Sequence, residues 1–148
     1  MGRRRPRWIL TISVVVVAVG IAVWSTFFDK PPEKCSPVTD LLNFNRSQSS
    51  LISSKGGDGA PNAAEQTAYQ QWADGLAERA QKVTDPELAA QATQLAQLAN
   101  QFVMGLPRMR ADTEARAPGA PAPGVVYEMS ALNNQITEHI SQLSQACS

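Results

Sequence analysis

Hydrophobic residues divide the chain into one continuous apolar run and a longer amphipathic part. Residues 9–28 carry no charge and consist mostly of Val, Ile and Ala. About 20 helical residues span about 30 Å, which is the hydrocarbon thickness of a bilayer. The run therefore predicts a transmembrane helix over residues 9–28, after a basic tail of residues 1–8 and before a juxtamembrane linker of residues 29–35.

The charges that flank this run predict its orientation. Four arginines lie within residues 3–7, and no acidic residue occurs before Asp29. Because basic flanks stay in the cytoplasm, we expect residues 36–148 on the extracytoplasmic, periplasmic side of the cell membrane. The alternative is a cleaved secretory signal, but such signals have an apolar core of only about 7–15 residues followed by small residues. Aromatic residues stand at this exit instead, so we predict an uncleaved signal anchor.

Apolar residues after the linker recur every three or four positions, which is the spacing of helices with one buried side. The first stretch opens at Ser36 and Pro37, a favourable N-cap followed by proline at the first helical position. Its apolar residues are Val38, Leu41, Leu42, Leu51 and Ile52. Residues 53–62, SSKGGDGAPN, predict a flexible loop.

The second stretch begins at Asn62, which is expected to form a capping box with Glu65. Its apolar stripe consists of Ala64, Ala68, Trp72, Leu76, Ala80 and Val83. The periodicity then breaks at Asp85-Pro86. Because a residue before proline avoids the helical region, Asp85 predicts the cap of a third helix.

The third helix has the most regular pattern of the chain. Its stripe consists of Leu88, Ala92, Leu95, Ala99, Phe102 and Leu106. We expect Gly105 and Pro107 to end it, because both residue types disfavour a helix interior. Residues 117–124, APGAPAPG, predict an exposed linker, and a fourth helix is expected over residues 125–146. The stripe of that helix consists of Met129, Leu132, Ile136, Ile140 and Leu143.

The two cysteines, Cys35 and Cys147, provide a check on the number of helices. Outside the cytoplasm cysteines are expected to oxidise, although two free thiols or a bridge to another chain are alternatives. An even number of antiparallel helices brings both ends of the domain together, whereas three helices would leave the cysteines about 25–30 Å apart. We therefore predict an all-α fold, an up-and-down bundle of about four helices closed by a Cys35–Cys147 disulfide.

Composition excludes several functions. The chain has 13 basic and 13 acidic residues, and four of the basic ones precede the apolar run, so the remainder has a net charge of −4. This mild acidity argues against binding to nucleic acid. The chain holds one histidine, His139, and lacks nucleotide-binding, zinc-protease and hydrolase motifs. We predict that the protein is not an enzyme and has no cofactor or metal.

Two residues raise the alternative of a bound ligand. His139 together with a methionine could hold haem inside a helical bundle, and Trp72 could form an aromatic wall for a small molecule. The simpler interpretation places Trp72 in the core and His139 at the edge of the apolar stripe. A cavity near Trp72 and His139 would favour a ligand-binding domain over a scaffold.

The third helix also lacks charge on its polar side. No charged residue occurs in residues 88–107, and Gln94, Gln97 and Gln101 take the place of the usual Lys and Glu. Loss of charge is typical of interface cores, where burying an ion is costly, although a solvated low-charge surface is the alternative. In the fourth helix, Glu138 is the only charged side chain after Glu128. We therefore predict that the surfaces of the third and fourth helices bind a partner, with Gln94, Gln97 and Gln101 in the contact.

Together these patterns predict a non-enzymatic accessory or scaffold protein, anchored in the lipid bilayer. Its helical domain would bind a larger membrane or envelope protein complex. The alternative is a small-ligand or haem-binding sensor or carrier domain tethered to the membrane. The topology resembles that of bacterial single-pass exported proteins. In a eukaryote, Asn45-Arg46-Ser47 would be a glycosylation sequon.

Overall fold

The computed structural model describes residues 32–55 and 61–148. The predicted tail (residues 1–8) and membrane span (residues 9–28) lie outside this range, as does the first part of the predicted linker, residues 29–31. In the described ranges, no helix combines the length and the apolar composition needed to cross a membrane.

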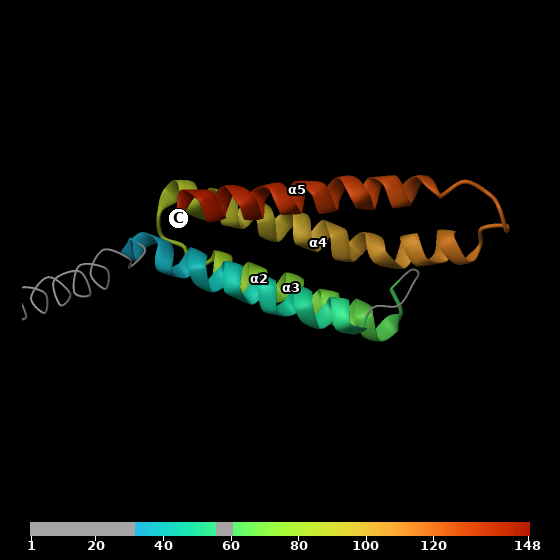
Figure 1. Cartoon of the computed structure of the whole chain (residues 1–148), viewed down its shortest axis with the longest axis horizontal. Coiled ribbons are helices and arrows are strands. Elements are labelled where there is room, and N and C mark those ends of the chain that lie inside the picture. Colours follow the sequence, from blue (N-terminus) through green and yellow to red (C-terminus); the bar gives the residue numbers. More distant parts are fainter. Residues whose placement is uncertain (1–31, 56–60) are drawn as a thin grey trace, which may run out of the picture. The chain divides into compact units, whose positions relative to one another are not determined.

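The described residues of the domain form four α-helices and no strand, which confirms the all-α prediction. A 3-10 turn, η1 (Glu33–Cys35), leads into α2 (Ser36–Lys55), followed by α3 (Ala63–Ala80), α4 (Pro86–Glu114) and α5 (Gly124–Ala146). Within Lys34–Ser148, each helix packs against the next one along the chain, as Figure 1 shows, while the contact between α2 and α5 is the smallest among the four adjacent pairs. The bundle is therefore less tightly closed between its first and last helices.

The disulfide joins the two ends of the domain as predicted. Cys35 and Cys147 are bonded, with their Cα atoms 5.5 Å apart. Cys35 is fully buried beside Val38 and Leu41, at the start of the core. The pairing is the arrangement that four antiparallel helices require.

The starts of α3 and α4 follow the predicted capping residues. The Asn62 side chain accepts hydrogen bonds from the backbone N–H groups of Ala64 and Glu65, at 2.9 and 3.0 Å. The Glu65 carboxylate accepts from the Asn62 N–H and completes the capping box. Asp85 caps α4 by accepting from the Leu88 N–H at 3.2 Å, with Pro86 in the first turn. The start of α2 differs, because Ser36 is itself helical and the chain enters through η1.

Leucine and alanine dominate the core. The largest fully buried side chains are Leu41, Leu76, Leu95, Leu106 and Leu143. Alanines at the contact between α3 and α4 allow the two helices to approach closely. Two residues of the predicted apolar stripes lie outside the core, because Leu51 and Ala64 are exposed.

The predicted end of the third helix was wrong. Gly105 and Pro107 lie inside α4, which continues to Glu114. Gly105 serves helix packing instead, because a Cβ atom there would overlap the Met129 sulfur of α5. Leu106 is buried in a second apolar cluster with Val125 and Met129, and these contacts hold the helix beyond Pro107.

The boundaries of the two predicted connections shift slightly. The helix α2 runs to Lys55, so residues 53–55 of the predicted loop are helical, and residues 56–60 lie outside the described ranges. The predicted linker is non-helical over residues 117–123, and Gly124 already begins α5. Gly119 has a φ of 80° and follows Pro118, and the Ala120 N–H donates to the Ala117 carbonyl at 3.1 Å. This is the geometry of a type II turn.

Candidate functional site

A cleft of about 380 Å³ opens between α2 and α5. All four helices contribute to its lining, with α3 and α4 forming the floor. The lining residues are Asn45, Ser49, Ile52, Ser53, Tyr69, Trp72, Phe102, Asn133, Ile136, Thr137 and Ile140. It lies where α2 and α5, the least closely packed of the adjacent helix pairs, face each other.

Three aromatic rings form the floor of the cleft. Trp72 meets Tyr69 and Phe102 edge to face, with ring centroids 6.3 and 6.4 Å apart. Tyr69 and Phe102 lie 5.6 Å apart in a tilted arrangement. Such edge-on pairs are favourable and rigid, so the floor presents a fixed apolar surface.

A hydrogen bond fixes the rim of the cleft to this floor. The Trp72 indole N–H donates to the Asn45 side-chain oxygen at 2.9 Å. Because an indole nitrogen can only donate, the Asn45 amide nitrogen is the group left to donate to another molecule. Asn45 is the sequon residue, and its side chain is committed to this contact.

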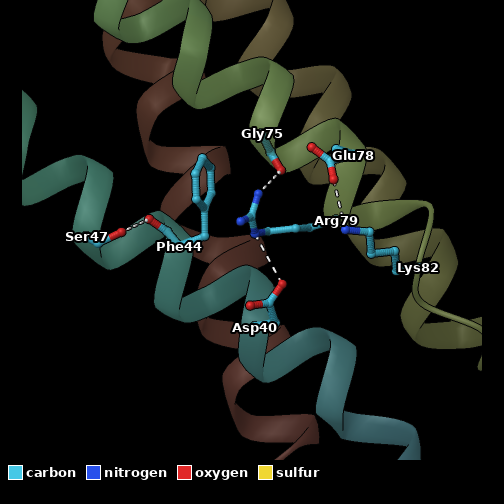
Figure 2. Close-up of polar contacts among 7 residues, drawn as sticks. All are labelled: Asp40, Phe44, Ser47, Gly75, Glu78, Arg79 and Lys82. Carbon is cyan, nitrogen blue, oxygen red and sulfur yellow. Dashed lines mark hydrogen bonds and ion pairs between the residues drawn. The ribbon is translucent and has the colours of Figure 1, made fainter.

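Phe44, Arg79 and Asp40 hold α2 against α3 and so set the position of one cleft wall. The Phe44 ring of α2 packs where Gly75 of α3 has no side chain. Figure 2 shows Arg79 of α3 reaching toward α2, with its guanidinium carbon 3.9 Å from the centre of the Phe44 ring. The Arg79 Nε lies 3.2 Å from the Asp40 carboxylate, and its Nη1 donates to the Gly75 carbonyl. These contacts favour packing of α2 on α3 over packing on α5.

The polar groups of the cleft are all uncharged. In the described ranges, the hydroxyls of Ser47 and Ser54 donate to carbonyls of their own helix, and no such bond involves Ser49 or Ser53. On the opposite wall, the Thr137 hydroxyl donates to the Asn133 carbonyl at 2.9 Å and keeps its acceptor capacity. The cleft therefore combines an apolar floor with neutral hydrogen-bonding walls.

The Tyr69 hydroxyl stays protonated over the whole physiological range. Burial, and then the nearby Glu65 carboxylate, raises the pKa of Tyr69 above its ordinary value of about 10. Both causes disfavour the phenolate. Tyr69 therefore adds no charge to the cleft.

The structure confirms that Trp72 belongs to the core, where it is 6% exposed and also lines the cleft, and it places His139 elsewhere. His139 is half-buried on α5, outside the cleft lining, and its Nδ1 is buried without a hydrogen-bond partner. Among the residues that the structure describes, no group of three or more His, Cys, Asp or Glu side chains could hold a metal. Within the described lining of the cleft there is no histidine or methionine, so the predicted pair of haem ligands does not lie there.

The three predicted partner-binding glutamines lie on the outer face of α4. Gln94, Gln97 and Gln101 are all exposed. Gln97 also lines a shallow groove between α3 and α4, whose other residues include Ala77, Ala80, Ala96 and Asn100. Asn100 also lines a second hollow between α3 and α4, together with Asp74, Pro107 and Met104, which is 74% exposed.

The described fold is thus a disulfide-closed domain of four antiparallel helices, with a neutral cleft on one side and an uncharged groove on another. Comparison with protein-family models, with curated proteins and with solved structures finds no match. The functional interpretation therefore depends on the residues and their geometry.

Sequence analysis identified Trp72 but missed the walls of the cleft. Asn45, Ser49 and Ser53 recur every four residues along α2 and line one side. Asn133 and Thr137 show the same spacing on α5. These two rows of small polar residues lie beside the apolar residues Ile52 and Ile136. This pattern in the sequence could have indicated a neutral cleft.

Proposed function

We propose that the protein is a non-enzymatic accessory or scaffold subunit anchored in the membrane by residues 9–28. Its extracytoplasmic domain binds a larger membrane or envelope protein complex through the outer face of α4. The uncharged, exposed surface of this helix is the observation that carries the proposal. The anchor is supported by the length and composition of the apolar run and by the arginines before it.

The exposed face of α4 carries no charge between Glu87, in its first turn, and Arg108. This face, called here the α4 face, consists of Ala90, Thr93, Gln94, Gln97, Asn100, Gln101, Met104 and Pro107. Each of these residues is exposed in the isolated domain. Amides and hydroxyls can be buried at an interface if they are hydrogen-bonded, whereas an unpaired Lys or Glu cannot be buried cheaply.

Charge is absent from the α4 face but present on neighbouring solvated surfaces. On α3, Lys82 and Glu78 form an ion pair at 2.9 Å. Immediately after Pro107, Arg108 and Arg110 pair with acidic residues one turn further along α4. The α4 face differs in this from the charged surfaces on α3 and beyond Pro107, and it shares its low charge with α5, where Glu138 is the only Asp, Glu, Lys or Arg after Glu128. The contrast with the charged surfaces supports docking at the α4 face.

The groove beside the α4 face favours a helical partner. Ala77, Ala80 and Ala96 line it, and small residues let a second helix approach closely. We therefore propose a partner protein that presents an uncharged α-helix to this groove, with glutamine amides bonding across the contact.

The test uses the tagged full chain in native membranes after mild crosslinking. Gln94→Lys, Gln97→Lys and Gln101→Lys should each move the chain from a larger complex to its free form, with at least a tenfold loss of complex. Gln71→Lys is the matched control, because Gln71 is exposed on α3 outside the groove. Unchanged complexes in all three variants would contradict the proposal, and so would a complex that contains only copies of this chain.

A second candidate function is supported by the cleft at Trp72. A small-ligand sensor or carrier needs a preformed pocket, and 380 Å³ lies within the range of about 300–1,000 Å³ that is typical of such sites. The haem version of this alternative is not proposed, since His139 lies outside the described cleft lining and no methionine is among the described lining residues.

A further inference from the structure

We propose that the cleft between α2 and α5 binds a small, electrically neutral molecule with an aromatic or branched alkyl body and a hydrogen-bond acceptor. The inference rests on the second candidate function above and is independent of docking at the α4 face. It is based on the aromatic floor of the cleft and on its uncharged polar walls.

The size of the cleft selects a small molecule over a protein segment. An α-helix with its side chains is about 10–12 Å across, which a volume of 380 Å³ cannot enclose over even two turns. An aromatic ring with a short polar substituent fits such a volume. Small pockets lined mostly by apolar groups, with a few convergent polar ones, are the usual form of ligand sites.

The lining of the cleft determines the charge of the ligand. Among the described residues that line the cleft there is no Asp, Glu, Lys, Arg or His. A charged ligand would lose hydration on entry and gain no opposite charge in return. A neutral molecule avoids this cost, so the cleft discriminates against anions and cations of the same shape.

The hydrogen-bonding groups determine how the ligand lies. The Asn45 oxygen is occupied by Trp72, so Asn45 offers its amide N–H groups to an acceptor on the ligand. Ser49 and Ser53 add hydroxyls on the same wall. The apolar body of the ligand then rests on Trp72 and Phe102, with its polar group turned toward α2.

The walls of the cleft are held in place before a ligand arrives. Phe44 and Arg79 fix α2 on α3, and the Cys35–Cys147 bond ties the ends of α2 and α5 together. A preformed site loses less conformational entropy on binding. We therefore expect α2 and α5 to keep their positions when a ligand binds.

The experiment titrates the full chain in lipid nanodiscs with three water-soluble probes of one shape. Benzamide is neutral, benzoate is an anion and benzylammonium is a cation. The readout is the ¹⁵N-indole resonance of Trp72 in tryptophan-labelled protein, assigned with Trp72→Phe. We expect benzamide to shift this resonance saturably, and the two charged probes to bind at least tenfold more weakly. Equal or unsaturable shifts with all three probes would overturn the proposal.

Matched variants separate binding in the cleft from binding elsewhere. Ser49→Phe should fill the cleft from the α2 wall and abolish the benzamide shift, while Ser50→Phe, outside the lining, should retain it. Thr137→Phe repeats the test from the α5 wall. If Ser49→Phe and Thr137→Phe both bind benzamide as Ser50→Phe does, the cleft is not the site.

The two proposals fail in distinguishable ways. Gln97→Lys should lose the protein complex and keep the benzamide shift, because Gln97 does not line the cleft. If the α4-face variants lose the protein complex but benzamide binds to no form of the chain, only the ligand site is contradicted. Probe binding with intact complexes in all α4-face variants contradicts docking alone.

Discussion

At the scale of single residues, two glycines inside helices serve packing, and one of them, Gly105, was predicted to end its helix. Gly75 and Gly105 each lie against a side chain of a neighbouring helix, Phe44 and Met129 respectively, at a position that a Cβ atom would occupy. Glycine costs a helix interior about 1 kcal/mol relative to alanine. The close approach of two helices offsets this cost, and it cannot be seen in the local sequence.

Replacement of Gly75 by alanine should therefore destabilise the domain despite the higher helix propensity of alanine. The new methyl group would overlap the Phe44 ring, which the Arg79 guanidinium covers at 3.9 Å. We expect Gly75→Ala to lower the free energy of unfolding by about 1–3 kcal/mol, as overpacking does. Urea denaturation of the full chain, followed by circular dichroism, measures this change. Gly124→Ala is the control, since nothing lies within 4 Å of its added Cβ, and equal stability of both variants would contradict the packing role.

Tyr69 should make folding stability fall at high pH. Its pKa is raised in the folded domain, chiefly by burial, so the folded state holds this proton more tightly than the unfolded state. The contribution is fully present below about pH 10, the unfolded pKa, and is lost as the pH rises through the folded pKa. Tyr69→Phe should therefore show a smaller loss of stability between pH 9 and about pH 11 in urea titrations.

The control for this pH dependence is Tyr127→Phe, which removes the hydroxyl of a tyrosine that is 65% exposed. Both variants lose one tyrosine, but only Tyr69 is packed among the aromatic rings of the cleft. The same curve for wild type and Tyr69→Phe would show that burial of this phenol does not affect folding.

At the scale of elements, the sequence predicted where helices begin better than where they end. The caps at Asn62 and Asp85 are local hydrogen bonds between neighbouring residues, so their pattern is visible in the sequence. The end of α4 depends on contacts of Leu106 with Val125 and Met129, which are distant in sequence. The apolar stripes are also local patterns, and they predicted most of the core. The cleft could not be predicted in this way, because it arises where α2 packs closely on α3 and little on α5.

Pro107 should weaken α4 without ending it. Proline has no N–H to donate to the carbonyl of Val103, and it costs a helix interior about 3 kcal/mol relative to alanine. We expect Pro107→Ala to raise the free energy of unfolding by about 1–3 kcal/mol, measured by urea denaturation. Pro121→Ala in the non-helical segment is the control and should change stability little. A loss of stability in Pro107→Ala would show that the proline ring is needed where it stands.

At the scale of the whole domain, the disulfide and the number of helices depend on each other. Parity predicted that Cys35 and Cys147 meet, and the structure places them in one bond across 112 residues of sequence. The four-helix bundle and its disulfide could thus be predicted together from the number of helices, because an even number of antiparallel helices brings both ends of the domain to the same side. The α4 face was also visible in the sequence as missing charge, whereas the sequence does not identify the partner proposed for it.

Removal of the disulfide should cost much of the stability of the domain. In the chain-entropy model, a loop of this length contributes about 4–5 kcal/mol. A variant with both Cys35→Ser and Cys147→Ser should lose about that amount in urea denaturation. The wild type under reducing conditions is the matched control and should unfold at the same urea concentration. A double variant as stable as the oxidised protein would contradict this role of the bond.

The most direct test of docking at the α4 face is site-specific photo-crosslinking in native membranes. A photoreactive amino acid replaces Gln97 in the full chain, and in a parallel sample it replaces Gln71, which is exposed outside the groove. The account predicts one discrete adduct with a different protein from position 97 and none from position 71. No adduct at position 97, or an adduct with the mass of two copies of this chain, would contradict it.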